Sequence, residues 1–236
     1  MCSIFELYVN GSGCASYATR PCIIDRKGAI LKQKHFIDSH KAVTFIYILT
    51  MIVLYKQWEN STAWVYLALH GTYGILWVLK SRIFPDWQWE QPTGWLYGLV
   101  IWGGLSLYWV APWLLMARGV QAPAWYLGLC ISLNIFGVFF HFVADMQKYT
   151  TLSLQPNRLF TGGVFSKIRS INYFGEMLIY FGFSLLAMHW LPVVILLVWI
   201  IFVWLPFMRK KEHRLSRYPE FAAYKNRTKM FIPFLF

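Results

Sequence analysis

The feature that most constrains this chain is a series of long apolar runs separated by short polar stretches. Each run is near the roughly 20 residues that a helix needs to cross a bilayer. Only 14% of the 236 residues are charged, whereas charged residues make up about a quarter of soluble domains. The sequence therefore predicts an all-α membrane protein with about six transmembrane helices. The expected spans cover residues 42–57, 62–80, 94–117, 122–146, 171–189 and 191–208.

The basic residues are divided unevenly between the two ends of these spans. Of the 22 Lys and Arg residues, all but Lys56 and Arg118 fall at one end: before the first span, after the second, after the fourth or after the last. Because cytoplasmic loops carry the excess of Lys and Arg, both termini are predicted to be cytosolic. This division also accounts for the net charge of +12 without a nucleic-acid partner. The predicted parts are a cytosolic segment 1–41, a bundle 42–208 and a cytosolic tail 209–236 that forms an interfacial helix.

A polar face runs along the predicted fourth span. At 100° per residue, Asn134, His141, Asp145 and Lys148 fall within about 60° of arc. Polar groups in a membrane helix are costly unless they are partnered, so this face is expected to line a cavity. One alternative is that these groups only join helices by bonding to one another. Another is an ion pair between Asp145 and Lys148, three residues apart.

A second polar face runs along the predicted fifth span, where Asn172, Glu176 and Tyr180 recur every four residues with Tyr173 beside them. A carboxyl group such as Glu176, roughly two turns inside the membrane edge, indicates function by default. It is a candidate general acid, with its proton held by burial, or a ligand for a substrate hydroxyl or amide. The alternative is a buried glutamate paired with a basic side chain.

The loop between these two spans is basic and contains glycine. It carries Arg158, Lys167 and Arg169 and ends where the fifth helix is expected to begin. A helix N-terminus surrounded by basic side chains suits a phosphate or a carboxylate. Loops on the cytosolic side are always basic, so this pattern alone does not establish an anion site.

The predicted second span also carries a face of aromatic and polar side chains, which includes His70 and Tyr73. Such a face is more often due to packing than to a site. His70 lies in the middle of the membrane, however, and needs a partner or faces a substrate. The residues of this face are Tyr66, His70, Tyr73, Trp77 and Lys80.

The cysteines indicate no metal site. Their spacing matches no zinc-ligand pattern, and four in a chain of this length do not form a disulfide framework. Free thiols are therefore expected at Cys2, Cys14, Cys22 and Cys130.

Three segments of the sequence carry a family resemblance. They are ADMQKY at 144–149, GGVFSKIRSINYFGEM at 162–177 and the tail residues EHRLSRY, YKNRT and FIP. These segments resemble the C-terminal domain of steroid 5-alpha-reductases and their relatives of unassigned function, the DUF1295 group. Sterol C14 and C7 reductases and isoprenylcysteine carboxyl methyltransferases are more distant relatives. The resemblance implies a cofactor in the half 122–208, completed by the tail.

The resemblance offers two cofactors, NADPH in the reductases and S-adenosylmethionine in the methyltransferases. Asp145, Gln147 and Lys148 look like the reductase branch. The expected function is therefore reduction of a C=C bond, by NADPH, in a sterol-like or other lipid substrate from the bilayer. The alternative is methylation of a lipid or prenylated-cysteine carboxyl group. Ser170-Ile171 replaces the His-Pro or Asn-Pro usual in the family, which leaves a non-catalytic lipid-binding relative open.

The same resemblance implies roles for individual residues. Lys148, Arg158 and Arg169 would meet the cofactor's phosphates, while Asn172, Tyr173 and Glu176 would position its ribose and nicotinamide. The expected location is the endoplasmic reticulum of a eukaryote or the inner membrane of a bacterium. The catalytic candidates are Glu176, Tyr173, His70 and Tyr73, with Glu90 a further candidate for polarising a ketone. The full expected cofactor set is Asp145, Gln147, Lys148, Arg158, Lys167, Arg169, Asn172, Tyr173, Glu176, Glu212, Tyr218, Tyr224 and Arg227.

Overall fold

The computed structural model describes residues 31–233, and the elements in that range are helices, without a strand. Five helical stretches are long and apolar enough to cross a membrane, which confirms the predicted class of all-α membrane protein. The predicted span 171–189 is the 15-residue helix α7 (Ile171–Leu185), which is shorter than the other five. Of the four cysteines, Cys130 is a buried free thiol and the other three lie outside the described residues. The five stretches are Gln33–Leu54, Ser61–Ile83, Trp95–Ala117, Ala124–Leu154 and Trp190–Leu215.

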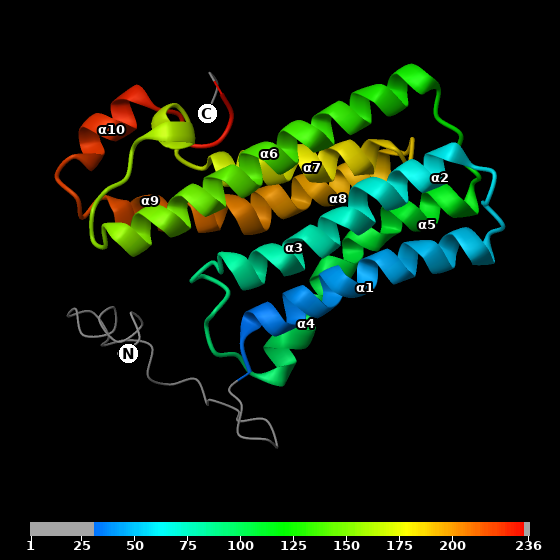
Figure 1. The fold of residues 1–236 in the computed structure, drawn as a ribbon, viewed down its shortest axis with the longest axis horizontal. Helices are drawn as coiled ribbons and strands as arrows, with labels where there is room; N and C mark the ends of the chain where they lie inside the picture. Colours follow the sequence, from blue (N-terminus) through cyan, green and yellow to red (C-terminus); the bar gives the residue numbers. More distant parts are fainter. Residues whose placement is uncertain (1–30, 234–236) are drawn as a thin grey trace.

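The first three stretches form one side of the bundle (Figure 1). The first is a single helix, α1, which packs against both α3 and α4. The second and third stretches each change helical geometry in the middle. Their elements are α1 (Gln33–Leu54), α2 (Ser61–Tyr66), η2 (Leu67–Gly71), α3 (Thr72–Ile83), α4 (Trp95–Ser106), η3 (Leu107–Trp109) and α5 (Val110–Ala117).

The other side of the bundle is built on the pair α6 and α7, which make the most extensive helix–helix contact in the described chain. A loop with one short helical turn, η4, joins them. The last long stretch runs alongside, and a separate small helix, α10, follows it and lies near the loop (Figure 1). The elements are α6 (Ala124–Leu154), η4 (Gly163–Ser166), α7 (Ile171–Leu185), α8 (Trp190–Trp199), η5 (Ile200–Trp204), α9 (Leu205–Leu215) and α10 (Phe221–Arg227).

Two of the changes in helical geometry have proline as their cause. Proline lacks an N–H and its ring crowds the carbonyl four residues earlier, so the regular ladder is interrupted at that point. Four residues before Pro112 lies Tyr108 in the tight turn η3. Four residues before Pro206 lies Phe202 in the wide turn η5. The predicted kink at Pro112 therefore takes the form of a local tightening, and the span continues through it.

Glycine allows α6 and α7 to approach closely. A Cβ atom on Gly137 would lie 2.7 Å from the carbonyl oxygen of Gly175. One on Gly175 would lie 2.5 Å from the backbone nitrogen of His141. Small residues at membrane-helix interfaces allow this kind of backbone contact. The two predicted polar faces, on α6 and α7, consequently meet along one seam.

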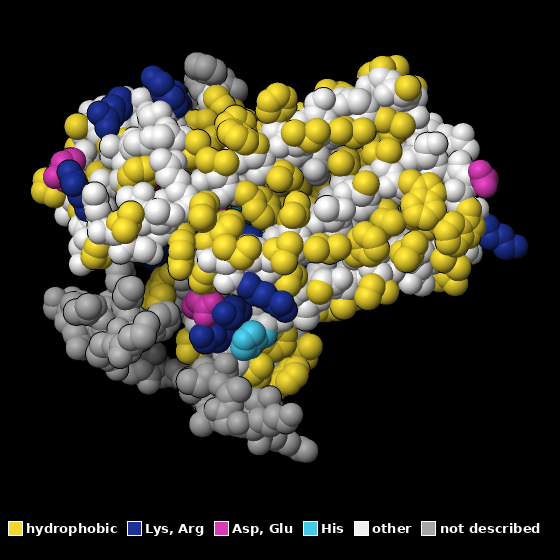
Figure 2. All heavy atoms as spheres, viewed as in Figure 1, with side chains coloured by type: hydrophobic (Ala, Val, Ile, Leu, Met, Phe, Trp, Pro, Cys, Tyr) yellow, Lys and Arg dark blue, Asp and Glu magenta, His cyan; other side chains and the backbone are white. Residues whose placement is uncertain are grey.

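Several helices extend beyond the predicted spans. The sequence predicts a first span from residue 42, whereas α1 begins at Gln33 and takes in His40 and Lys41. The predicted tail begins at 209, yet α9 continues to Leu215, because residues such as Arg209, Lys210 and Glu212 favour helix. Figure 2 shows hydrophobic side chains spread over the long middle of one face, with Lys and Arg in one group toward α9 and α10 and in another near the start of α1.

Candidate functional site

A lysine and three polar side chains meet inside the bundle, and we call this group the Lys41 cluster: Lys41, Tyr73, Glu176 and Tyr180. Lys41 is 3% exposed, and its Nζ donates a hydrogen bond to Tyr180 Oη. The same Nζ lies 4.5 Å from the centre of the Tyr73 ring. Tyr73 Oη donates to Glu176 Oε1 at 3.5 Å. The cluster thus joins α1, α3 and α7, and only Glu176 is partly exposed in it.

A second group, the charge cluster, lies at the end of α3 and α6: Lys80, Asp86, Asp145 and Lys148. Lys80 forms an ion pair with Asp145, and the two side chains are 3% and 4% exposed. Lys148 Nζ lies 2.6 Å from Asp86 Oδ2. Asp145 and Lys148 are therefore not partners of each other, as one reading of their spacing predicts. Each instead pairs with a residue from the front half of the chain.

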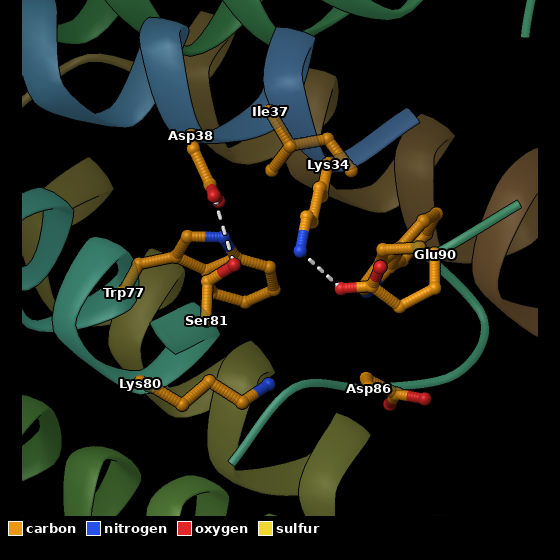
Figure 3. Close-up of a pocket in the computed structure, with 9 residues that line it drawn as sticks. Lys34, Ile37, Asp38, Trp77, Lys80, Ser81, Asp86 and Glu90 are labelled. Carbon is orange, nitrogen blue, oxygen red and sulfur yellow. Dashed lines mark hydrogen bonds and ion pairs between the residues drawn. The ribbon is translucent and has the colours of Figure 1, made fainter. Parts of the chain in front are cut away.

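Asp86 lies on the loop between α3 and α4, outside the spans. Burial alone acts to raise the pKa of this carboxyl group, but Lys148 and Lys80 act more strongly in the opposite direction, and its pKa is lowered. Asp86 also lines a cavity of about 10 Å³, room for about one water. Lys34, Asp38, Lys80 and Glu90 surround the same cavity, from α1, α3 and the loop (Figure 3).

The loop after α6 is held by a third group, the tail clamp: Arg169, Glu212, Tyr224 and Thr228. The Arg169 guanidinium forms an ion pair with Glu212 through Nε and donates from Nη1 to the Thr228 carbonyl at 2.6 Å. Tyr224 Oη donates to the carbonyl of Phe165 at 2.7 Å, and burial raises the pKa of Tyr224 to about 12. Backbone bonds from Arg169 and Ser170 to the tail complete the clamp.

The other predicted cofactor residues lie around the same end of the bundle. Gln147 Oε1 accepts from the backbone N–H of Val164 at 3.2 Å, which fixes the glycine loop. Arg158 lies by a cavity of about 240 Å³ and donates to Gln155. Arg227 donates to Thr161, another residue of that cavity. Lys167 is exposed, and Tyr218 accepts from Arg217.

The predicted catalytic residues do not all come together. Tyr73 and Glu176 meet, as described. His70 instead bonds to Tyr66 Oη at 2.9 Å and stacks on Phe183 at 3.9 Å between ring centres. Tyr173 packs against Trp204. Glu90 is occupied by Lys32 and Lys34.

Four buried polar atoms along the seam of α6 and α7 have no hydrogen-bond partner in the described chain. They are one amide nitrogen that donates, two oxygens that accept, and one imidazole nitrogen that donates or accepts depending on the tautomer. Unpaired polar groups in the interior are costly and call for a partner. The atoms are Asn134 Nδ2, His141 Nε2, Asp145 Oδ1 and Asn172 Oδ1.

Two important residues carry little signal in the sequence as functional groups. Lys41 is counted with the basic residues before the first span, because the apolar run starts just after it. Asp86 stands in a loop of ordinary composition. The signal that identifies Lys41 is the helical register: it lies seven residues before Ile48 and eleven before Ile52, on the face that is buried.

Together, the fold and this seam define a helical, multi-pass membrane protein with a polar site at one end of its bundle. A family model described as 3-oxo-5-alpha-steroid 4-dehydrogenase matches residues 93–236, more than half of the chain. The chain therefore belongs to this family, which places it among the membrane reductases and their related enzymes and confirms the resemblance to steroid 5-alpha-reductases. Comparison with curated proteins gives no match.

Proposed function

We propose that the protein is an NADPH-dependent reductase of a C=C bond in a sterol-like or other lipid substrate. The family match takes in α6, α7 and the tail, and so both polar faces. The observation that carries the proposal is the row of unpartnered polar atoms along the seam, next to Glu176. A site for a polar ligand inside an apolar bundle needs this combination, because the groups are costly when nothing binds them.

The unpartnered atoms suit a nucleotide cofactor. The ribose hydroxyls and the carboxamide of NADPH offer both donors and acceptors, which match Asn134, Asp145 and Asn172. Lys148 and Arg158 would provide cations for the phosphates. Lys167, Tyr218 and Arg227 would contact the outer end of the cofactor, beside the cavity that Arg158 lines.

The tail clamp would support this site indirectly. Most donors of the Arg169 guanidinium are bonded to Glu212 and to backbone carbonyls of the tail. We therefore propose that Arg169, Glu212 and Tyr224 hold the loop in place, and that Gln147 fixes its glycine turn. Lys148 and Arg158 then remain the proposed phosphate contacts.

Residues of the Lys41 cluster would donate the proton that the reduction requires. When bound, NADPH would supply a hydride for one carbon of the double bond, and a residue of this chain would have to supply the proton for the other carbon. Tyr73 and Glu176 share a hydrogen bond and lie beside the seam. Tyr173 and His70 are committed to packing contacts and would shape the site.

Cofactor binding by the purified protein in detergent tests the proposal. NADPH should bind, and binding should weaken about tenfold or more in Glu176→Ala and in Lys148→Ala, because each removes a charged contact. Arg118→Ala, an exposed residue at the opposite end of the bundle, is the matched control and should bind as the wild type does. NADPH should then be oxidised in the presence of a 3-oxo-4-ene steroid.

Two outcomes contradict the proposal in different ways. Binding of S-adenosylmethionine without NADPH would assign the site to a methyltransferase. Binding of neither would favour a lipid-binding protein without catalysis. We also propose that the site end faces the cytosol, in the endoplasmic reticulum of a eukaryote or the inner membrane of a bacterium. A tag near Arg118 should then be inaccessible from the cytosol.

A further inference from the structure

The Lys41 side chain is the least expected charge in the molecule. It lies in the third turn of α1, a helix long enough to cross the membrane, and is 3% exposed. An intramembrane cation is rare and usually functional, and it needs a partner. The contacts described for Lys41 Nζ are with phenol and indole groups: a hydrogen bond to Tyr180 and positions over the rings of Tyr73, Tyr180 and Trp77 at 4.5, 4.8 and 5.1 Å.

The carboxyl group that balances the charge of Lys41 is that of Glu176, which Lys41 does not contact directly. Tyr73 stands between them, since its ring faces Lys41 Nζ and its hydroxyl donates to Glu176 Oε1 at 3.5 Å. Glu176 and Lys41 also act on each other electrostatically. Among the described residues, the titratable groups that interact with Glu176 include one ammonium and four phenols: Lys41 on α1, Tyr73 on α3, Tyr108 on η3, and Tyr173 and Tyr180 on α7.

A further phenol in this group lacks a partner. Tyr108 is 4% exposed, its ring centre lies 4.2 Å from that of Tyr180, and its hydroxyl is bonded to nothing in the described chain. A buried hydroxyl is stabilised when a partner accepts or donates a hydrogen bond. The Lys41 cluster and Tyr108 together thus contain a positive charge, a carboxyl group and an unpaired hydroxyl donor, all within apolar helices.

We propose that Lys41 is a positioning residue that keeps Glu176 ionised through Tyr73, so that the Tyr73 hydroxyl, and not the Glu176 carboxyl, is the proton donor. Two opposite charges in one apolar site leave no net charge there, whereas a protonated Glu176 would leave Lys41 uncompensated. The role in catalysis rests on the proposed function. The charge state of Glu176 does not.

The proton step balances as follows. The O–H bond of Tyr73 breaks and a C–H bond forms at the substrate carbon that did not receive the hydride. The negative charge left on Tyr73 Oη is offset by the Lys41 ammonium over its ring. A proton from water then restores the phenol. Glu176 orients the hydroxyl throughout and keeps its negative charge.

Carbodiimide labelling tests the charge state without a substrate. Dicyclohexylcarbodiimide reacts with protonated carboxyl groups in apolar surroundings, and mass spectrometry of the Glu176 peptide measures the product. Labelling should be low in the wild type and in Lys41→Arg, and should rise about tenfold in Lys41→Met and Lys41→Gln. Lys34→Met, which removes a partly buried lysine from the start of the same helix, should label Glu176 as the wild type does, and Glu176→Gln should not label.

A second measurement separates this role from packing. Lys41→Met should unfold at a lower temperature in detergent, because Glu176 loses its compensating charge and Tyr180 loses its hydrogen-bond donor. Activity is therefore compared below that temperature and against Lys41→Arg, which keeps the charge. The kcat with a 3-oxo-4-ene steroid should fall about tenfold or more in Lys41→Met and stay near the wild-type value in Lys41→Arg. Equal labelling of Glu176 in the wild type, Lys41→Met and Lys41→Gln would overturn the inference. Failure of the wild type to bind NADPH would overturn the proposed function alone, because the labelling still decides the charge state.

Discussion

The tail clamp and the α6–α7 seam lie at neighbouring positions of the same half of the molecule, yet they treat their polar groups in opposite ways. In the clamp, the guanidinium of Arg169 bonds to a carboxylate and to carbonyls of the tail, and Tyr224 bonds to Phe165. Along the seam, polar atoms of Asn134, Asp145 and Asn172 are buried without a partner. Polar groups whose hydrogen bonds are satisfied within the protein stabilise its fold, and polar groups without partners are suited to binding a ligand. Charge alone does not distinguish the two regions, because both are rich in it.

The largest effect is expected from breaking the clamp. Arg169→Met leaves Glu212 partly buried without its partner and frees the tail carbonyls, which should destabilise the fold by about 3–5 kcal/mol. Thermal unfolding in detergent, followed by size-exclusion chromatography, measures the loss. Arg158→Met is the matched control, because this arginine is exposed, and its effect should stay within about 0.5 kcal/mol. Equal stability of the two variants would contradict a clamp.

A change in the charge cluster separates stability from binding. Lys80→Met leaves Asp145 buried and unpaired, and should cost about 3–4 kcal/mol of stability. The double variant Lys80→Met with Asp145→Leu removes both charges and should regain most of that loss. NADPH binding should remain weak in the double variant, since Asp145 is a proposed ligand. Recovery of both stability and binding would show that this ion pair is structural only.

The closeness of the two helices can be tested at the seam itself. In Gly175→Ala the new Cβ would lie 2.5 Å from the backbone nitrogen of His141, so the helices must separate, at a cost of about 1–3 kcal/mol. Gly128→Ala is the control in the same helix pair, because nothing lies within 4 Å of its added Cβ. It should be neutral or stabilising by about 0.5 kcal/mol. A stable Gly175→Ala protein with full NADPH affinity would argue against a seam of fixed geometry.

The smallest expected effect concerns a single bond in the clamp. Tyr224→Phe loses the hydrogen bond to the Phe165 carbonyl, which is worth about 1 kcal/mol. Burial raises the pKa of Tyr224 to about 12. The contribution of Tyr224 to stability is therefore complete below the ordinary tyrosine pKa and is lost as the pH rises from there to the raised pKa. The wild type should therefore lose stability between about pH 10 and about pH 12 more steeply than Tyr224→Phe. Parallel unfolding curves would leave Tyr224 without this role.

The apolar runs predict most of the fold, because the bilayer sets the length of each helix. The sequence also places the two polar faces correctly, since Asn134, His141 and Asp145 follow the helical period and are buried on α6. Partners are less accessible from sequence. The spacing of Asp145 and Lys148 suggests a local pair, but each bonds across the bundle to Lys80 or Asp86, and nothing in the local pattern encodes that choice.

The ends of the helices account for the other differences. A search for apolar runs excludes the charged residue at the edge of a run, so the predicted first span begins just after Lys41. In the folded chain that charge is balanced by groups on α3 and α7, which are distant in sequence. Similarly, the basic composition of the loop suits an anion but does not reveal that Arg169 is bonded to the tail, because its acceptors lie more than 50 residues away in sequence.

The tail clamp also has a consequence for the order in which the protein is made. Arg169 finds its acceptors at Lys225 and Thr228, and the backbone of Arg169 and Ser170 bonds to Lys229 and Met230. A ribosome must therefore translate past Met230 before the loop between α6 and α7 can be fixed. A chain cut short before Lys225 keeps its long apolar helices, but its Arg169 guanidinium retains Glu212 as a partner and lacks its carbonyl acceptors. The loop between α6 and α7 can therefore take its final form only after the last helices have been synthesised.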